Sequence, residues 1–146
     1  FRARKYPTNG VCVNATTSLP LLIVEDNPDN AQLTRWILED EGYKLALAET
    51  AEQALDMLAQ TAYAVVLMDI SLPGMDGKEA IAKIRATESI KLIPVIAVTA
   101  HAVLDERDAI LASGADFLVT KPIMEEALIT AINSCLSGDF PERAKA

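Results

Sequence analysis

The chain has 146 residues and a formal net charge of −8, with 13 lysines and arginines against 21 aspartates and glutamates. This length is enough for one domain with a hydrophobic core. The acidic balance argues against binding to nucleic acid, which needs a basic face. No apolar run approaches the roughly 18 residues that span a membrane, and the first residues lack the apolar segment of a secretory signal. We therefore expect a cytoplasmic protein without membrane contact.

The two ends of the chain differ in composition from the part between them. Residues 1–18 carry three cations and no acidic side chain. We interpret them as a disordered leader or linker, and residues 139–146 as a polar tail. Residues 19–138 then form the domain. This domain could stand alone or be a part of a longer protein, and both alternatives stay open.

The two cysteines, Cys12 and Cys135, lie near opposite ends of the sequence and lack the spacing of metal ligands. We interpret both as free thiols in a reducing compartment, with a disulfide between them as the alternative. The chain has a single histidine, so the ligands for a zinc site are missing. Any bound metal should therefore be a hard cation held by oxygen atoms.

From residue 19 onward, the hydrophobic pattern alternates a strand with a helix five times. Continuous apolar runs predict buried strands at residues 21–24, 44–48, 65–68, 95–98 and 117–119. Apolar residues at helical spacing predict helices near residues 27–42, 51–58, 77–86, 105–113 and 124–136. The fourth helix has the weakest periodicity and the fifth the clearest.

Turn and capping residues support several of these boundaries. Asn27 can cap the first helix with Pro28 at its first position, and Gly42 is a typical left-handed stop. Residues 50–53 fit a capping box at the start of the second helix. The last helix lacks such a signal, because Met124 occupies the position where a serine, aspartate or asparagine is expected.

Five strand–helix units with continuous apolar strands predict a parallel sheet that is covered by helices on both faces. Right-handed crossovers then restrict the topology to a doubly wound α/β sheet. In such sheets the chemistry lies outside the carboxyl ends of the strands. The residues that follow each strand are therefore the candidates for a functional site.

Polar residues follow four of the five predicted strands. Glu25 and Asp26 come directly after the first strand, Asp69 after the third, Thr99 after the fourth, and Lys121 two positions beyond the fifth. Each residue alone has an ordinary structural explanation, such as a solvated acidic loop or a surface lysine. If the strands are parallel neighbours, however, all five side chains converge at one edge of the sheet.

The order and spacing of these residues over positions 21–136, with the Pro/Gly-rich loop at 73–77, resemble the receiver domain of bacterial response regulators. Chemotaxis-regulator-like single receivers are the nearest comparison. The resemblance implies a (βα)5 flavodoxin-like fold with strand order 2-1-3-4-5. It also implies a signalling domain of two-component phosphorelays rather than an enzyme. Such a domain takes a phosphoryl group from a phosphohistidine of a sensor histidine kinase or a histidine phosphotransfer protein, and assists its own dephosphorylation.

In this resemblance Asp69 is the phosphoacceptor and Mg²⁺ or Mn²⁺ is the cofactor. Asp26, Asp69 and the carbonyl of Ser71 would bind the metal directly, and Glu25 through a metal-bound water. The charges agree with this assignment, because three carboxylates in one crevice raise each other's pKa unless cations offset them. A divalent ion together with the ammonium of Lys121 would supply the missing positive charge.

The same resemblance implies roles around the phosphoryl group. Lys121 and the Thr99 hydroxyl would contact its oxygens, with backbone N–H groups at Thr99 and Ala100. Ser71 and His101 border the phosphoryl position and would tune its hydrolysis. A downstream protein would bind through the fourth helix, the fifth strand and the fifth helix.

The chain also departs from the receiver pattern at one position. Receivers usually carry a tyrosine or phenylalanine three residues before the site lysine, as a conformational switch, and here that residue is Leu118. The adjacent Phe117 should face the opposite side of the sheet, because side chains alternate along a strand. The bond between Lys121 and Pro122 is a candidate for a cis peptide, which is common at this place in receivers.

Three alternatives to a receiver domain make different demands on the sequence. A haloacid-dehalogenase-type phosphatase needs a second aspartate two residues after the nucleophile, where this chain has Ser71. A flavodoxin-like cofactor module needs a Gly- and hydroxyl-rich loop after the first strand, where this chain is acidic. A pseudo-receiver that only binds proteins is the remaining alternative, although it would be expected to lack Asp69, Lys121 or the acidic pair.

Overall fold

The computed structural model describes residues 19–100 and 103–138. Within these residues, five strands alternate with five helices, as predicted. The strands are β1 (Leu21–Val24), β2 (Leu45–Ala48), β3 (Val65–Asp69), β4 (Val95–Thr99) and β5 (Phe117–Thr120). The helices are α2 (Pro28–Asp40), α3 (Ala51–Gln60), α4 (Gly77–Ala86), α5 (Leu104–Ala112) and α6 (Glu125–Ser137).

All five strands form one parallel sheet with the order β2-β1-β3-β4-β5. The predicted doubly wound topology and its strand order are thereby confirmed. Strand β2 lies on one side of β1, whereas β3, β4 and β5 follow on its other side. The topological switch point therefore lies between β1 and β3, which are neighbours. Val24 of β1 pairs with Met68 of β3, and Asp69 pairs with Val98 of β4. These pairings align the carboxyl ends of the three central strands.

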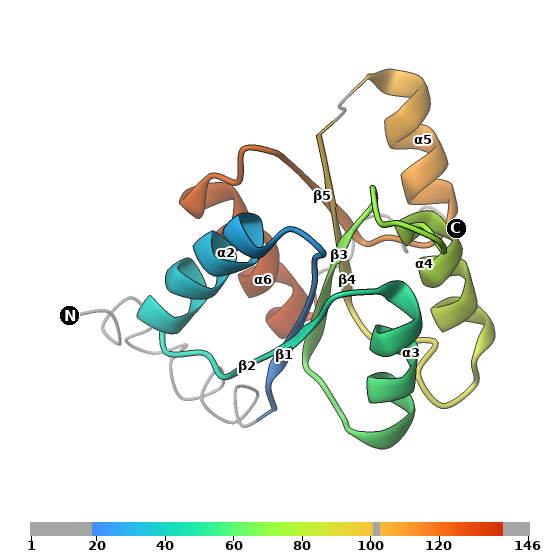
Figure 1. Ribbon diagram of the computed structural model, residues 1–146, viewed down its shortest axis with the longest axis horizontal. Coiled ribbons are helices and arrows are strands. Elements are labelled where there is room, and N and C mark those ends of the chain that lie inside the picture. Colours follow the sequence, from blue (N-terminus) through green and yellow to red (C-terminus); the bar gives the residue numbers. More distant parts are fainter. Residues whose placement is uncertain (1–18, 101–102, 139–146) are drawn as a thin grey trace.

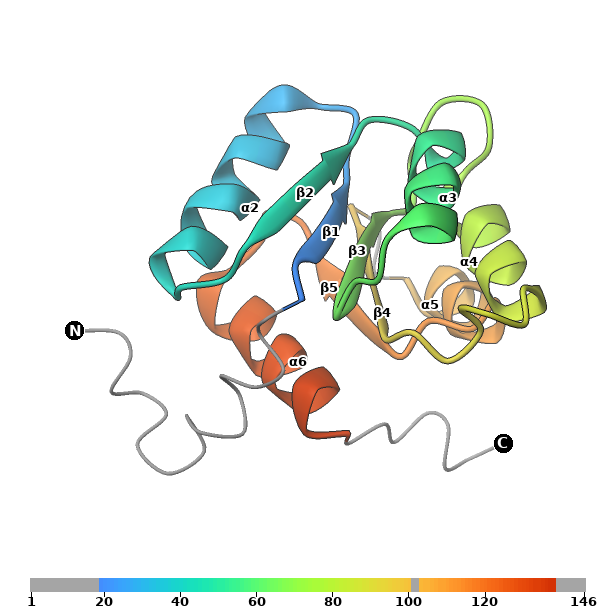
Figure 2. The ribbon, with the colours of Figure 1, turned by 90° about the horizontal axis from the view of Figure 1, so that it is seen from below.

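Helices cover both faces of the sheet (Figures 1 and 2). Helices α2 and α6 lie on one face, and α3, α4 and α5 lie on the other. Side chains alternate between the two faces, so each central strand contributes to both halves of the core. Leu22, Val24, Val66 and Met68 pack on the side of α3 and α4. Leu21, Ile23, Val65 and Leu67 pack on the side of α2 and α6.

The helix ends follow the capping signals closely. Asn27 accepts hydrogen bonds from the backbone N–H groups of Asp29 at 2.9 Å and Asn30 at 3.1 Å, so α2 begins at Pro28. The chain then turns away at Gly42, whose φ of 95° is in the left-handed region. No side-chain cap is present at Met124. Helix α6 therefore begins without the hydrogen bond that holds the start of α2.

The capping box at the start of α3 differs in one bond from the expected pattern. Thr50 Oγ1 accepts a hydrogen bond from the N–H of Gln53 at 3.0 Å, as expected. The Gln53 side chain, however, accepts from the N–H of Glu49 at 2.9 Å rather than from the N–H of Thr50. The Gln53 side chain therefore holds the backbone at Glu49, one residue before the position that a capping box predicts.

Among the described residues, no helix is long and apolar enough to cross a membrane. Cys135 is buried in α6 within the core shared with α2. Cys12 and His101 lie outside the described residues, as do the predicted leader and tail. The prediction of two free thiols, and the interpretation of residues 1–18 and 139–146, therefore stay predictions.

Candidate functional site

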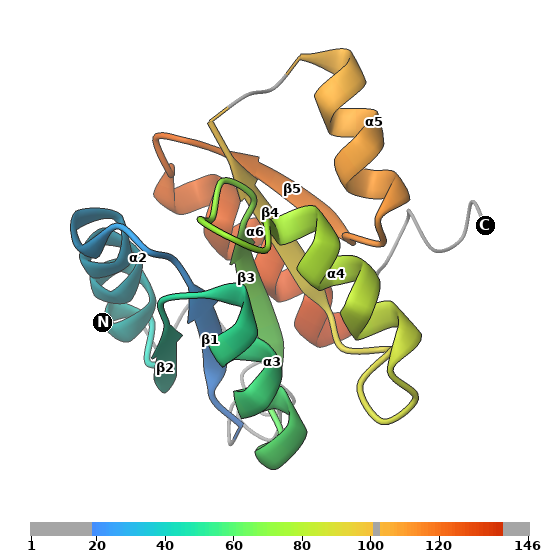
Figure 3. The ribbon, with the colours of Figure 1, turned by 45° about the vertical axis from the view of Figure 1, so that its right-hand side comes forward.

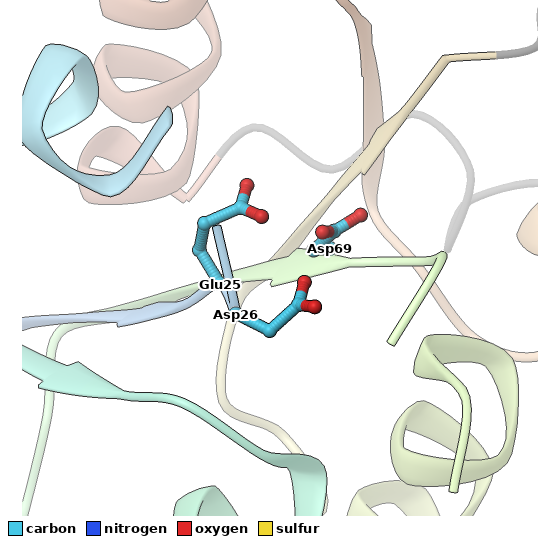
Figure 4. Close-up of side chains that lie close together, drawn as sticks. All are labelled: Glu25, Asp26 and Asp69. Carbon is cyan, nitrogen blue, oxygen red and sulfur yellow. The ribbon is translucent and has the colours of Figure 1, made fainter. Parts of the chain in front are cut away.

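The acidic residues after β1 and at the end of β3 meet at the carboxyl edge of the sheet (Figure 4). One carboxylate oxygen each of Glu25, Asp26 and Asp69 lies within 4.8 Å of the other two. The strand register explains this convergence. Val24 pairs with Met68, so the residues that follow them, Glu25 and Asp69, reach the same edge of the sheet. The structure thus brings Asp69 beside the adjacent pair Glu25 and Asp26, which lie far from it in the sequence.

Burial distinguishes two of the three carboxylates from those of an ordinary acidic loop. Asp69 is 2% exposed and Glu25 is 5% exposed, whereas Asp26 is exposed to solvent. A buried carboxylate loses its hydration and needs hydrogen bonds or cations in return. The site therefore carries an electrostatic cost that its neighbours have to offset.

Lys121 supplies one of the offsetting charges. Its Nζ lies 3.3 Å from Oδ2 of Asp69 and 3.4 Å from Oε1 of Glu25. Its backbone N–H donates to the carbonyl of Thr99 at 2.8 Å, which fixes the loop after β5 beside β4. The peptide bond from Lys121 to Pro122 is cis, as expected.

Backbone N–H groups hold the two buried carboxylates. The N–H of Ser71 donates to Oδ1 of Asp69 at 3.0 Å, and the N–H of Asn27 donates to Oε2 of Glu25 at 3.2 Å. Each donor lies two residues beyond the carboxylate that it contacts. The loops after β1 and β3 therefore orient their own acidic residues without the help of a ligand.

The pKa of Glu25 is raised mainly because its carboxyl group is buried, and also because Asp69 lies beside it. Burial raises it from 4.5 to about 7, together with the hydrogen bond and negative charge of Asp69. The N–H of Asn27 and the ammonium of Lys121 act in the opposite direction without cancelling this rise. Among the described residues, the ammonium of Lys121 pairs with two of the three carboxylates, Glu25 and Asp69, so the site favours a further cation. The carboxylate oxygens are hard ligands of the kind that Mg²⁺ and Mn²⁺ prefer.

Thr99 and Ala100 lie at the same edge of the sheet. Thr99 is the last residue of β4, is 1% exposed, and follows Val98, the partner of Asp69 in the register. Ala100 follows it and is exposed. Ser71 is exposed as well, at the start of the loop that leaves β3.

The two residues at the predicted switch position face opposite sides of the sheet. Leu118 packs against the core on the side of α3 and α4, whereas Phe117 packs against the core on the side of α2 and α6. Strand alternation predicts this arrangement. The aromatic ring of Phe117 therefore does not occupy the face on which Leu118 lies.

Two contributors to the site were missed from the sequence. The Asn27 side chain was expected to cap α2, but the backbone N–H of Asn27 also donates to Glu25. Gly77 was expected as the end of a turn and the start of a helix, yet a side chain there would also overlap with the backbone of Asp69. A glycine directly after a capping residue such as Asp76 is a signal that could have indicated this close approach.

Known proteins match the chain in both sequence and structure. Residues 21–133 match the family described as Response regulator receiver domain. Sensor protein GacS of Pseudomonas syringae pv. syringae is 40% identical over 130 residues, which are 84% of this chain and 14% of GacS. An uncharacterized 14.6 kDa protein of Leptolyngbya boryana is 36% identical, with 86% of this chain and 95% of that protein covered.

A solved structure supports the same assignment. The receiver domain of sensor histidine kinase PA1611 from Pseudomonas aeruginosa PAO1 superposes with a TM-score of 0.76 at 32% identity. The match covers 82% of this chain and 98% of that domain, whose structure has a magnesium ion coordinated in the active-site cleft. The chain therefore belongs to the response regulator receiver domain family, which accepts phosphoryl groups on aspartate in two-component signalling.

Proposed function

We propose that this receiver accepts a phosphoryl group on Asp69 from a phosphohistidine of a sensor kinase or a histidine phosphotransfer protein. One observation carries the proposal: a carboxylate only 2% exposed at the end of β3 faces two further carboxylates and one lysine. A solvated acidic loop would not bury such a group. A nucleophilic carboxylate whose charge is balanced by Lys121 and a bound cation would account for the arrangement.

The transfer exchanges one bond to phosphorus for another. A carboxylate oxygen of Asp69 attacks the phosphorus, the new O–P bond forms, and the P–N bond to the donor imidazole breaks. The electron pair of that bond stays on the imidazole nitrogen, and the ring leaves neutral when its other nitrogen carries a proton. Because transfer needs mainly positioning and charge neutralisation, the N–H of Ser71 is well placed to hold the attacking carboxylate in one orientation.

The donor set fits a divalent cation, Mg²⁺ or Mn²⁺. Asp26 and Asp69 would bind it directly with the Ser71 carbonyl, and Glu25 would act through a metal-bound water. When bound, the ion neutralises carboxylate and phosphoryl charge. Lys121 and the Thr99 hydroxyl would contact the phosphoryl oxygens, with an N–H group near Ala100.

Removal of the phosphoryl group would be self-catalysed, with water as the attacking group. Ser71 is small and exposed, which leaves space for a water molecule beside Asp69. His101 is the second candidate for tuning this rate and stays a prediction.

The downstream partner is proposed to bind at α5, β5 and α6. A hollow of about 610 Å³ lies between β5 and α6, and its lining includes Leu118, Ala127 and Thr130. Lys121 connects this surface to the site, because it follows β5 directly. We place the signalling step in the cytoplasm, where sensor kinases present their phosphohistidines.

Mass spectrometry with a small-molecule phosphoryl donor and Mg²⁺ tests the acceptor. The wild type should gain about 80 Da, the mass of one phosphoryl group, in an alkali-labile form. Asp69→Asn should abolish the gain, whereas Asp56→Asn, which makes the same change on the exposed face of α3, should leave it intact. Undiminished labelling of Asp69→Asn would contradict the assignment, and an unlabelled but folded wild type would favour the pseudo-receiver.

A further inference from the structure

The first residue of α4, Gly77, packs directly against the strand end that carries Asp69. A Cβ at this position would overlap with the carbonyl oxygen of Asp69, lie 2.7 Å from Cα of Ile70, and lie 3.0 Å from the carbonyl carbon of Asp69. All three atoms belong to the backbone, so no flexible side chain can move aside. Figure 3 shows the loop from β3 folding back to α4 over the end of the strand.

The backbone at this contact is held from both sides. The N–H of Ile70 donates to the carbonyl of Val98 at 2.9 Å, which fixes the strand end to β4. The N–H of Gly77 donates to the carbonyl of Ile70 at 3.0 Å, which fixes α4 to the same peptide. Asp76 caps the helix by accepting from Glu79 at 2.9 Å. A methyl group at position 77 would therefore displace either the helix start or the peptide of Asp69.

The glycine is not required by its own backbone conformation. The described glycines with positive φ are Gly42, Gly74, Gly114 and Gly138, and Gly77 is not among them. Inside a helix, alanine is favoured over glycine by about 1 kcal/mol, so helix propensity gives no reason for a glycine at the first position of α4. The close approach to Asp69 is therefore the feature that requires a residue without a side chain.

We propose that Gly77 is a positioning residue for the carboxylate of Asp69. The expected effect on phosphorylation depends on Asp69 being the acceptor, as inferred above, whereas the effect on the geometry of its carboxylate does not. The hydrogen bond from the Ser71 N–H and the ion pair with Lys121 both require the present position of the Asp69 backbone. If the strand end yields rather than the helix start, this backbone moves by roughly 1 Å, and a displacement of that size can slow a reaction about 100-fold.

The test compares Gly77→Ala with Gly42→Ala, which adds the same methyl group far from the site. At Gly42 nothing lies within 4 Å of the added carbon, and its φ of 95° makes the variant strained and less stable. We expect Gly77→Ala to be labelled by the phosphoryl donor at least tenfold more slowly than the wild type. Gly42→Ala should be labelled at the wild-type rate per folded molecule, despite its lower stability.

A second measurement reads the geometry without any phosphoryl donor. The amide proton shift of Ser71 reports the hydrogen bond to Oδ1 of Asp69, so it should move in Gly77→Ala and stay in Gly42→Ala. If Gly77→Ala is partly unfolded, both measurements are made in a stabilising osmolyte and normalised to the folded fraction. The amide shift then supports or overturns the positioning role even if Asp69 is not the acceptor.

The outcomes separate the two proposals. An unlabelled wild type overturns the acceptor assignment, while a displaced Ser71 amide in Gly77→Ala still supports the positioning role. A wild type that is labelled, with Gly77→Ala labelled just as fast or its Ser71 amide unmoved, overturns the positioning role alone.

Discussion

Lys121 and Asp69 lie 52 positions apart in the chain, yet Nζ of the lysine is 3.3 Å from Oδ2 of the aspartate. The contact crosses the end of β4, which separates β3 from β5 in the sheet. Nζ also lies 3.4 Å from Oε1 of Glu25, so one ammonium is shared by two buried carboxylates. Any added negative charge at Asp69 must therefore change how Lys121 divides its contacts.

Lys121→Ala should weaken the conformational response to phosphorylation more than the phosphorylation itself. Asp69 keeps its nucleophilic oxygen in the variant, but the contact that links the phosphoryl group to the start of α6 is lost. Charge-assisted contacts of this kind contribute about 1.5–3 kcal/mol. NMR shifts of α6 amides with beryllofluoride, a phosphoryl mimic, measure the response. Lys91→Ala, at an exposed lysine, is the control, and equal shifts in wild type and Lys121→Ala would contradict the role.

The raised pKa of Glu25 predicts a pH dependence of stability. Because its pKa is about 7 in the folded protein and 4.5 ordinarily, the folded state binds the proton more tightly. This stabilisation is fully present below pH 4.5 and is lost as the pH rises through 7. Without metal, the free energy of unfolding should therefore fall over this range by about 1–3 kcal/mol.

Urea unfolding at several pH values measures this dependence. Mg²⁺ should restore the lost stability above pH 7, because it replaces the proton as the partner of the carboxylates. Glu25→Gln cannot ionise, so its metal-free stability should change less over the same range. If wild type and Glu25→Gln show the same pH profile, the assignment of the raised pKa to Glu25 is wrong.

Arg85→Met should destabilise the fold while leaving the folded site competent. The Arg85 guanidinium donates to Oδ2 of Asp116 at 2.9 Å and to the carbonyl oxygens of Gly114 at 2.9 Å and Lys91 at 2.8 Å. Asp116 is 2% exposed, and breaking a buried ion pair costs about 3–5 kcal/mol. Chemical denaturation measures this loss.

The matched control for Arg85 is Arg35→Met, which removes an exposed ion pair with Glu39 at 3.2 Å. Exposed pairs between residues four apart on a helix contribute about 0.3–0.5 kcal/mol. A loss in Arg85→Met as small as that in Arg35→Met would show that the Asp116 network contributes little.

Met124→Ser should stabilise the protein by adding the missing cap of α6. Met124 has extended backbone angles and is 64% exposed, so a serine there can accept from the first turn without displacing core atoms. A helix cap contributes about 0.5–2 kcal/mol. Met124→Ala, which lacks the hydroxyl, is the comparison in thermal unfolding. No difference between serine and alanine would mean that Glu125 and Glu126 already satisfy the helix start through its dipole.

The sequence by itself determined the elements and their ends. Apolar runs of four or five residues and apolar residues at helical spacing are local signals, and they placed all five strands and five helices correctly. Asn27 and Gly42 marked the ends of α2 because capping involves only the nearest peptide groups. The polar residues at the strand ends followed from the same local pattern.

The strand order came from the family resemblance, because hydrophobic periodicity does not specify which strands are neighbours. The contacts that shape the site were decided only by the tertiary structure: the overlap that excludes a side chain at Gly77, the shared ammonium of Lys121 and the raised pKa of Glu25. The physical reason is the same in each case. These properties depend on distances and burial between residues far apart in the chain, which are fixed only when the sheet and its helices pack together.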